Sequence, residues 1–147
     1  MKWSARIGDH VFANQSATLF VTYYIVQLLI YRPFLPSPQP HDPQPDAPFP
    51  AVAICVNATK ACLKILETQL AAGMTDIPVA ISASQLSAAL LVQQIWRLKA
   101  QAQQVEAPQD VKPVPGQTIP ELLSDVKKFI DILEASSVRW PLAALMV

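Results

Sequence analysis

The side chains best suited to chemistry are two cysteines and two histidines, which could supply a nucleophile, a base or metal ligands. Cys55 and Cys62 lie seven residues apart. On a helix that spacing is about 10.5 Å of rise, beyond the ~7 Å at which two cysteines can be bridged. His41 lies in a proline-rich stretch and His10 at an expected helix start, so neither has a position beside a cysteine. We expect buried, unpaired cysteines, solvated histidines, and neither a catalytic pair nor a metal site.

Carboxylates at helical spacing could form an acid–base pair, and Glu121, Asp125 and Asp131 have that spacing. Lys127 and Lys128 are interleaved with them, which is typical of a charged outer helix face. The three glycines of the sequence are isolated from one another and cannot form a phosphate-binding loop. The sequence therefore predicts a protein that is not an enzyme.

Aromatic and amide side chains on two apolar segments could instead line a binding site. We expect any effector pocket to lie between the helices predicted for residues 11–31 and 75–103, where the apolar faces are widest. Its expected lining is Tyr23, Tyr24, Gln27, Gln94 and Trp96. The competing interpretation is that these aromatic residues belong to the core, as most aromatics at helical spacing do.

The elements that would position these residues are helices, because apolar residues recur every three or four positions with almost no alternation. The predicted helices cover residues 11–31, 51–72, 75–103, a segment from 118 to the interruption at 136–137, and a short segment at 140–147. Gly73 is expected as a left-handed C-terminal cap, and Thr118 with Glu121 as a capping box. We predict an all-α, antiparallel domain of four to five helices that is part of a larger helical array.

A proline-rich stretch lies within this domain and does not mark a boundary between two domains. Eight of the eighteen residues from 33 to 50 are proline, which predicts an extended linker within a single domain of residues 1–147. A second loop is expected at residues 108–117.

Two helices show clear apolar faces, which we expect to be buried. The expected buried residues are Cys55, Ala58, Cys62, Ile65 and Leu66 on one helix, and Leu122, Val126, Phe129, Ile130 and Leu133 on the other.

Composition excludes several classes of protein. The chain has 147 residues, of which 52% are hydrophobic and 15% charged, and this excludes an intrinsically disordered protein. Eleven basic residues balance eleven acidic ones, so no basic excess exists to attract a nucleic acid. Residues 11–31 and 77–96 are uncharged and long enough to span a bilayer. Six polar side chains in each run favour buried helices of a water-soluble domain instead.

Four segments resemble, in order, the later part of the helical regulatory region of fungal zinc-cluster transcription factors. Residues 18–35 (TLFVTYYIVQLLIYRPFL) are similar to a long apolar helix that ends in an Arg-Pro-Phe turn. The other three are residues 51–62, 84–97 and 125–140, the last of which ends in an Arg-Trp pair. This region of the family is often called the middle homology region or fungal-specific transcription factor domain. Together the four segments cover most of the chain from residue 18 to residue 140.

The resemblance implies a nuclear domain that regulates transcription by RNA polymerase II through protein or effector interactions. The family's DNA-binding module has six cysteines that hold two zinc ions, and no position here matches it. We therefore expect a fragment with no cofactor of its own and no direct contact with nucleic acid. Its expected partners are the remainder of the regulator or other proteins, and its apolar ends predict self-association. The alternative is a stand-alone helical scaffold or membrane-associated protein without a role in transcription.

Overall fold

The described part of the chain is helical throughout. The computed structural model describes residues 10–35, 50–73, 78–104 and 118–137, and these contain no strand. The helices are α1 (His10–Tyr31), the 3-10 helix η1 (Arg32–Phe34), α2 (Ala51–Ala71), α3 (Pro78–Gln104) and α4 (Ile119–Ser137). The predicted all-α class is confirmed. The helix expected at residues 140–147, the loop at 108–117 and the residues just before Pro78 lie outside the described ranges.

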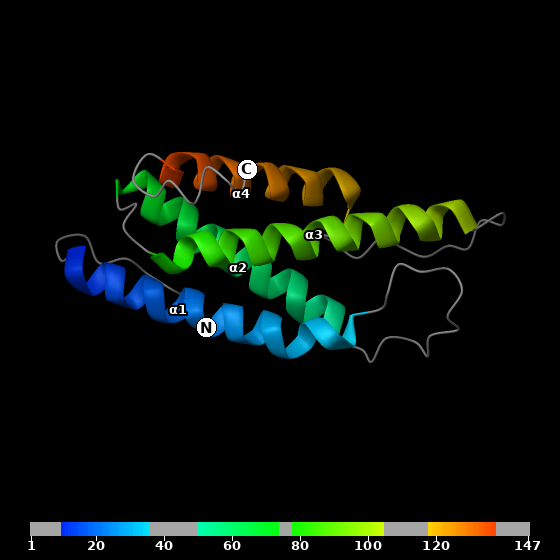
Figure 1. Cartoon of the computed structure of the whole chain (residues 1–147), viewed down its shortest axis with the longest axis horizontal. Helices are drawn as coiled ribbons and strands as arrows, with labels where there is room; N and C mark the ends of the chain where they lie inside the picture. The colour runs from blue at the N-terminus through cyan, green and yellow to red at the C-terminus, as the bar shows by residue number, and fades with distance from the viewer. Residues whose placement is uncertain (1–9, 36–49, 74–77, 105–117, 138–147) are drawn as a thin grey trace.

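The four α-helices pack around one another in an elongated bundle (Figure 1). In this view α1 lies along the lower edge, α4 along the upper edge and α3 between them, while α2 crosses behind α3. The colours run in opposite senses along successive helices. The most extensive contacts join α1 to α2 and α3 to α4, and smaller contacts join α1 to α3 and α2 to both later helices.

The proline-rich stretch is described only at its two ends. Pro33 lies in η1, where the backbone N–H of Leu35 donates to the carbonyl of Arg32 at 3.1 Å. Leu35 is extended, and Pro50 is the residue that precedes α2. Residues 33 and 34, which were expected in an extended linker, instead belong to a turn of 3-10 helix, because the fixed φ of proline also suits that turn. Residues 36–49 lie outside the described part.

Two predicted helix ends are confirmed. Gly73 has a φ of 70°, the left-handed conformation expected of a glycine that follows a helix. Its N–H donates to the carbonyl of Leu70 at 2.9 Å. At the start of α4, the carboxylate of Glu121 accepts hydrogen bonds from the hydroxyl of Thr118 at 2.7 Å and from its backbone N–H at 3.2 Å. These bonds hold the pKa of Glu121 below its usual value, the hydroxyl having the larger effect.

The core confirms one predicted helix face and corrects the other. All five residues predicted to be buried on α2 are buried. On α4 three of the predicted residues are buried, whereas Val126 and Ile130 are only partly covered, and Ile132 and Ser136 are buried instead. Because α4 contacts both α3 and α2, its buried face is turned toward Ile132. The buried face of α4 depends on where the neighbouring helices lie, and the spacing of apolar residues within α4 cannot predict their positions.

One described helix is long and apolar enough to cross a membrane, judged by length and composition alone. It is the segment Val79–Ala100 of α3, of which 44% is buried inside the bundle. This segment overlaps the second of the two uncharged runs in the sequence. The helix contacts all three other α-helices, an arrangement also found for core helices of water-soluble proteins.

Candidate functional site

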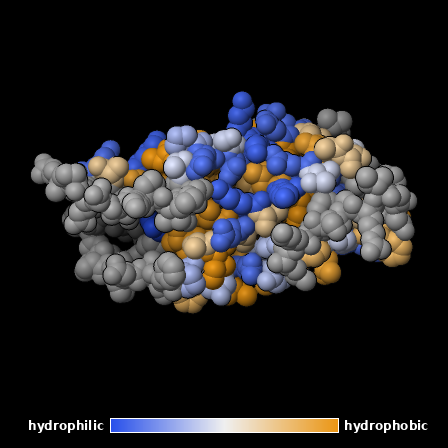
Figure 2. Space-filling view, turned by 180° about the vertical axis from the view of Figure 1, so that it is seen from behind, coloured by the Kyte–Doolittle hydropathy of each residue, from blue (hydrophilic) through white to orange (hydrophobic). Residues whose placement is uncertain are grey.

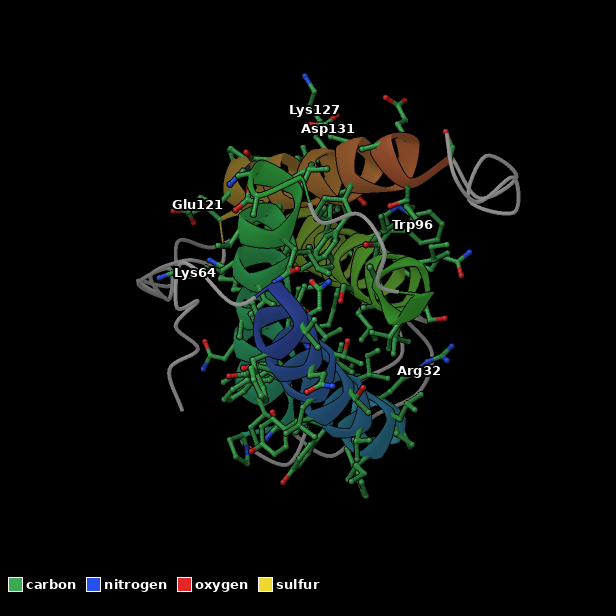
Figure 3. All side chains as sticks on the ribbon, turned by 90° about the vertical axis from the view of Figure 1, so that its left-hand side faces the viewer. Arg32, Lys64, Trp96, Glu121, Lys127 and Asp131 are labelled. Carbon is green, nitrogen blue, oxygen red and sulfur yellow. The ribbon has the colours of Figure 1, made fainter. Side chains whose placement is uncertain are left out.

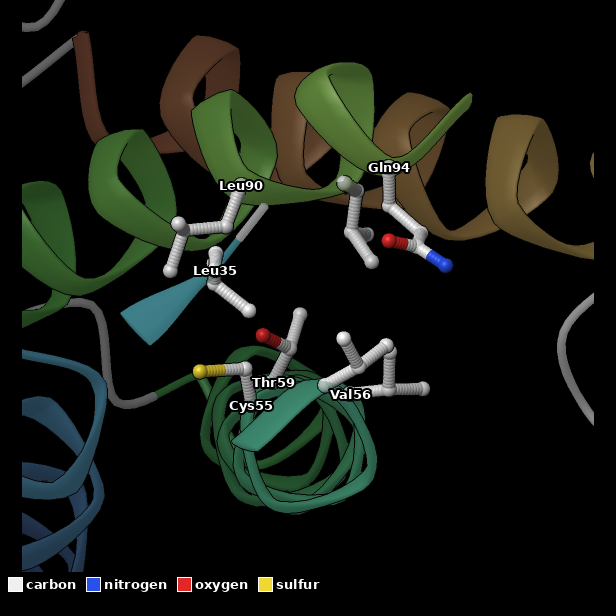
Figure 4. Close-up of a pocket in the computed structure, with 8 residues that line it drawn as sticks. Leu35, Cys55, Val56, Thr59, Leu90 and Gln94 are labelled. Atoms are coloured by element: carbon white, nitrogen blue, oxygen red, sulfur yellow. The ribbon is translucent and has the colours of Figure 1, made fainter. Parts of the chain in front are cut away.

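A small pocket lies between the first half of α2 and the second half of α3 (Figure 4). Leu35, the residue after η1, closes one side of it, so the turn that ends α1 contributes directly to the site. The pocket is partly open to solvent, and its cavity volume is about 10 Å³, which is room for about one water molecule. The lining residues are Leu35, Val52, Cys55, Val56, Thr59, Leu90, Leu91 and Gln94. Most of this lining is apolar.

Two buried polar side chains interrupt the apolar lining. Thr59 is 1% exposed and Gln94 is 7% exposed. Among the described residues, neither the Thr59 hydroxyl oxygen Oγ1 nor the Gln94 amide nitrogen Nε2 has a hydrogen-bond partner. Figure 4 shows the Thr59 hydroxyl on α2 turned to the Cys55 side of the pocket, and the Gln94 amide extending from α3 on the Val56 side. The pocket thus offers one hydroxyl and one amide donor to a bound molecule.

The state of the Thr59 hydroxyl is unusual for a threonine within a helix. Such a hydroxyl commonly bonds to the carbonyl of the preceding turn. Thr68, nine residues further along α2, makes such a bond. Its hydroxyl donates to the carbonyl of Lys64 at 2.7 Å. Leaving a buried polar group without a partner costs about 1–3 kcal/mol. A ligand or water that bonds to Thr59 and Gln94 would therefore offset part of this cost.

Both cysteines are buried and free, as predicted. Burial raises the pKa of both thiols, and that of Cys62 to about 12. A thiol with a raised pKa stays protonated at neutral pH and is neither a good nucleophile nor a metal ligand. Cys55 therefore contributes a soft, largely apolar surface to the pocket. No group of three metal-binding side chains occurs among the described residues, and His41 lies outside them.

The structure does not gather the five expected pocket residues around one site. Gln94 lines the pocket between α2 and α3, whereas the pocket was expected between α1 and α3. Tyr23 is exposed, and Trp96 is 64% exposed on the outer side of the bundle (Figure 3). Gln94 and Trp96 are two residues apart, a rotation of about 200° on a helix, so they occupy opposite faces of α3. That spacing argues against placing both in one pocket.

The remaining expected residues lie on α1. Gln27 donates from its amide nitrogen to the Tyr23 hydroxyl at 3.0 Å, and the rings of Tyr23 and Tyr24 meet edge to face with centroids 5.2 Å apart. Tyr24 packs against both clusters of core residues, and burial raises the pKa of its hydroxyl. Tyr24 thus has the core role of the competing interpretation, while Tyr23 and Gln27 form a pair on the outer part of the helix. Leu35 and Thr59 line the pocket but were not among the residues expected there. The Arg-Pro-Phe-Leu turn was visible in the sequence and could have indicated Leu35.

The charged residues of α4 form an outer face. Lys127 and Asp131 point away from the bundle (Figure 3). Lys128 pairs with Glu67 of α2 at 3.1 Å, and both side chains are partly exposed. Glu121 is exposed and occupied by its cap with Thr118. The carboxylates are thus arranged as a solvated face, as predicted.

A second candidate surface is the outward face of α1. Figure 2 shows hydrophobic side chains among hydrophilic ones along the lower edge of the molecule, where α1 lies. Most of the large exposed apolar residues belong to α1 and η1, and they are Val11, Phe12, Leu19, Tyr23, Val26, Leu29, Ile30 and Phe34. Within this face, the α1 stripe is the row Phe12, Ser16, Leu19, Tyr23, Val26 and Ile30. Apolar patches larger than a few hundred Å² commonly mark interaction sites.

Comparisons with known proteins add no relative. No family model matches the chain, and neither a curated protein nor a solved structure matches it. The functional argument therefore rests on the site geometry and on the sequence segments quoted above.

Proposed function

We propose that the chain is a nuclear regulatory domain that controls transcription by RNA polymerase II through binding of an effector or a partner protein. The support from sequence is the ordered resemblance of four segments to the regulatory region of fungal zinc-cluster transcription factors. The described residues of those segments lie on α1 with η1, on α2, on α3 and on α4, each of which contributes to the core, and residues 138–140 of the last segment lie outside the described part. The proposed role is one of binding without catalysis, and DNA recognition belongs to a different module of the regulator.

The observation that carries this proposal is the pocket closed by Leu35 of the Arg-Pro-Phe-Leu turn. Its buried Thr59 and Gln94 lack hydrogen-bond partners among the described residues, and its cavity volume of about 10 Å³ is room for about one water molecule. The proposed ligand is a small, mainly apolar molecule with a hydrogen-bond acceptor, and it would enter only in a packing in which α2 and α3 lie further apart. Regulation would follow if the ligand bound one packing of α2 and α3 more tightly than another, because only unequal affinity shifts such an equilibrium.

A reporter assay tests the regulatory role. The whole chain, fused to a heterologous DNA-binding module, should change expression of a reporter gene in yeast relative to that module alone. Thr59→Val and Gln94→Leu remove the two polar groups of the pocket and should weaken that change. Thr22→Val, on the exposed side of α1, and Gln93→Leu, beside Gln94 on α3, are the matched controls and should preserve it. Equal expression with the fusion and with the DNA-binding module alone would contradict the proposal.

The second candidate function is membrane association, which the length and composition of Val79–Ala100 favour. Against it, α3 contacts every other α-helix, and insertion into lipid would require those contacts to separate. Extraction of cell membranes with alkaline carbonate separates the two functions. Release of the expressed chain into the supernatant supports the regulatory domain, whereas retention in the pellet supports the membrane protein.

A further inference from the structure

The α1 stripe has the residue spacing of a helix–helix seam. Its members follow one another at intervals of four, three, four, three and four residues from Phe12 to Ile30. These five intervals average 3.6 residues, close to the 3.5-residue repeat with which two helices keep one row of side chains in mutual contact. The opposite side of α1, including Ala17, Val21 and Leu28, is buried in the bundle. α1 therefore has one seam packed inside the molecule and a second one facing outward.

The outward seam is large enough to hold a partner helix. Leu19 is 71% exposed and Phe12 is 67% exposed, and Val11, Leu29 and Phe34 extend the apolar surface beside the stripe. Eight half-exposed large side chains expose on the order of several hundred Å² of apolar surface, the size of patch that often marks an interaction site. That area approaches the ~800 Å² that each partner buries in a stable interface of standard size.

The absence of charge on α1 permits an identical helix as its partner. α1 contains no Asp, Glu, Lys or Arg, so no charge beside the stripe selects a differently charged helix or repels an identical one. The flanking polar residues Gln15, Thr22 and Gln27 are uncharged and can hydrogen-bond across a seam in either direction. We propose that the α1 stripe is a self-association surface on which α1 of a second copy of this chain packs antiparallel.

The antiparallel direction follows from Arg32 and from the symmetry of the stripe. Arg32 is exposed immediately after α1. In a parallel pair the two Arg32 side chains would lie together, whereas in an antiparallel pair they are about 33 Å apart. The stripe is centred on position 21, so Leu19 faces Tyr23 of the second copy and Phe12 faces Ile30 of the second copy. The small Ser16 then faces Val26 of the second copy, and the same surface serves both chains, as two-fold symmetry requires.

The oligomeric state of the full chain tests this surface. Sedimentation equilibrium from micromolar to near-millimolar concentration should give a reversible monomer–dimer transition. Leu19→Glu places a charge in the centre of the seam and should weaken dimerisation on the order of tenfold or more. The matched control is Leu123→Glu, because Leu123 is a leucine of α4 that is 51% exposed and lies outside the stripe. It should dimerise like the natural chain, and circular dichroism should show that both variants are folded.

Disulfide trapping tests the direction and register. Phe12→Cys mixed with Ile30→Cys should give a mixed disulfide-linked dimer, whereas Phe12→Cys alone should give none. The natural Cys55 and Cys62 are buried and contribute little background. A disulfide-linked dimer of Phe12→Cys alone would overturn the antiparallel register. A natural chain that stays monomeric at all concentrations would overturn self-association altogether, and so would a monomer that binds phosphatidylcholine vesicles through Leu19. These readouts do not involve the pocket, so they stand or fall separately from the proposed regulatory function.

Discussion

Thr59 is one of several buried polar residues whose side chains have no hydrogen-bond partner among the described residues. Its hydroxyl has no hydrogen-bond partner among the described residues, although the residue is almost completely buried. Since a hydroxyl in that position must lose its hydration on folding, the pocket holds a polar group at a cost to stability. Natural proteins commonly accept such costs at binding sites, which is consistent with the effector pocket proposed above.

The stability of a Thr59→Val variant measures this cost. Valine has nearly the same shape without the hydroxyl, so we expect the free energy of unfolding in urea to rise by about 1 kcal/mol. Thr68→Val is the control: its hydroxyl bonds to Lys64, so its removal should leave stability unchanged or lower it. A loss of stability in Thr59→Val as large as that in the control would mean that the Thr59 hydroxyl has a partner in solution.

The raised pKa of Cys62 predicts slow chemistry. With a pKa of about 12, the thiol stays protonated at neutral pH, and it is also fully covered. We expect the folded chain to react with a thiol reagent such as DTNB only as fast as it unfolds, and both cysteines to react at once in guanidinium chloride. Rapid labelling of Cys62 in the folded chain would show that α2 is not packed as described.

Among the elements, α4 has the best-defined start, and its cap should make stability depend on pH. The pKa of Glu121 is lowered in the folded chain, chiefly by the hydroxyl of Thr118. The resulting stability is therefore present above the unfolded pKa of about 4.3 and is lost as the pH falls through the lower folded value. Thr118→Ala should lower the urea midpoint at pH 7 and reduce its decline in acid. Ser124→Ala, an exposed position of the same helix, should change neither quantity.

The extent of each helix could be predicted from sequence, because its causes lie within a few residues. Gly73 and the Thr118 cap are local signals, and both have the predicted geometry. The pocket could not be predicted in the same way, because it depends on which helices become neighbours. Gln94 lines a pocket whose facing helix is α2, whereas α1 was the helix expected to face it. Thr59 lines the same pocket from α2, and nothing in the sequence distinguishes it from the other threonines.

For the whole molecule, Phe129 is the residue that most firmly fixes α4 to the rest of the core. It is fully buried in the larger core cluster, which includes residues of all four α-helices. Phe129→Ala should lower the free energy of unfolding by about 3–5 kcal/mol, a large part of the total for a small domain. Leu123→Ala on the outer side of α4 should change it by less than about 0.5 kcal/mol. Similar effects of the two substitutions would show that α4 does not pack through Phe129.

The uncharged character of α1 sets how its outward surface responds to solvent. No carboxylate, lysine or arginine lies between His10 and Arg32, so sodium chloride has almost nothing to screen there. Ammonium sulfate and moderate warming both strengthen the burial of apolar area, whereas cooling weakens it. Cold, dilute buffer should therefore favour separate chains, and mild salting-out should bring them together at protein concentrations where they would otherwise stay apart.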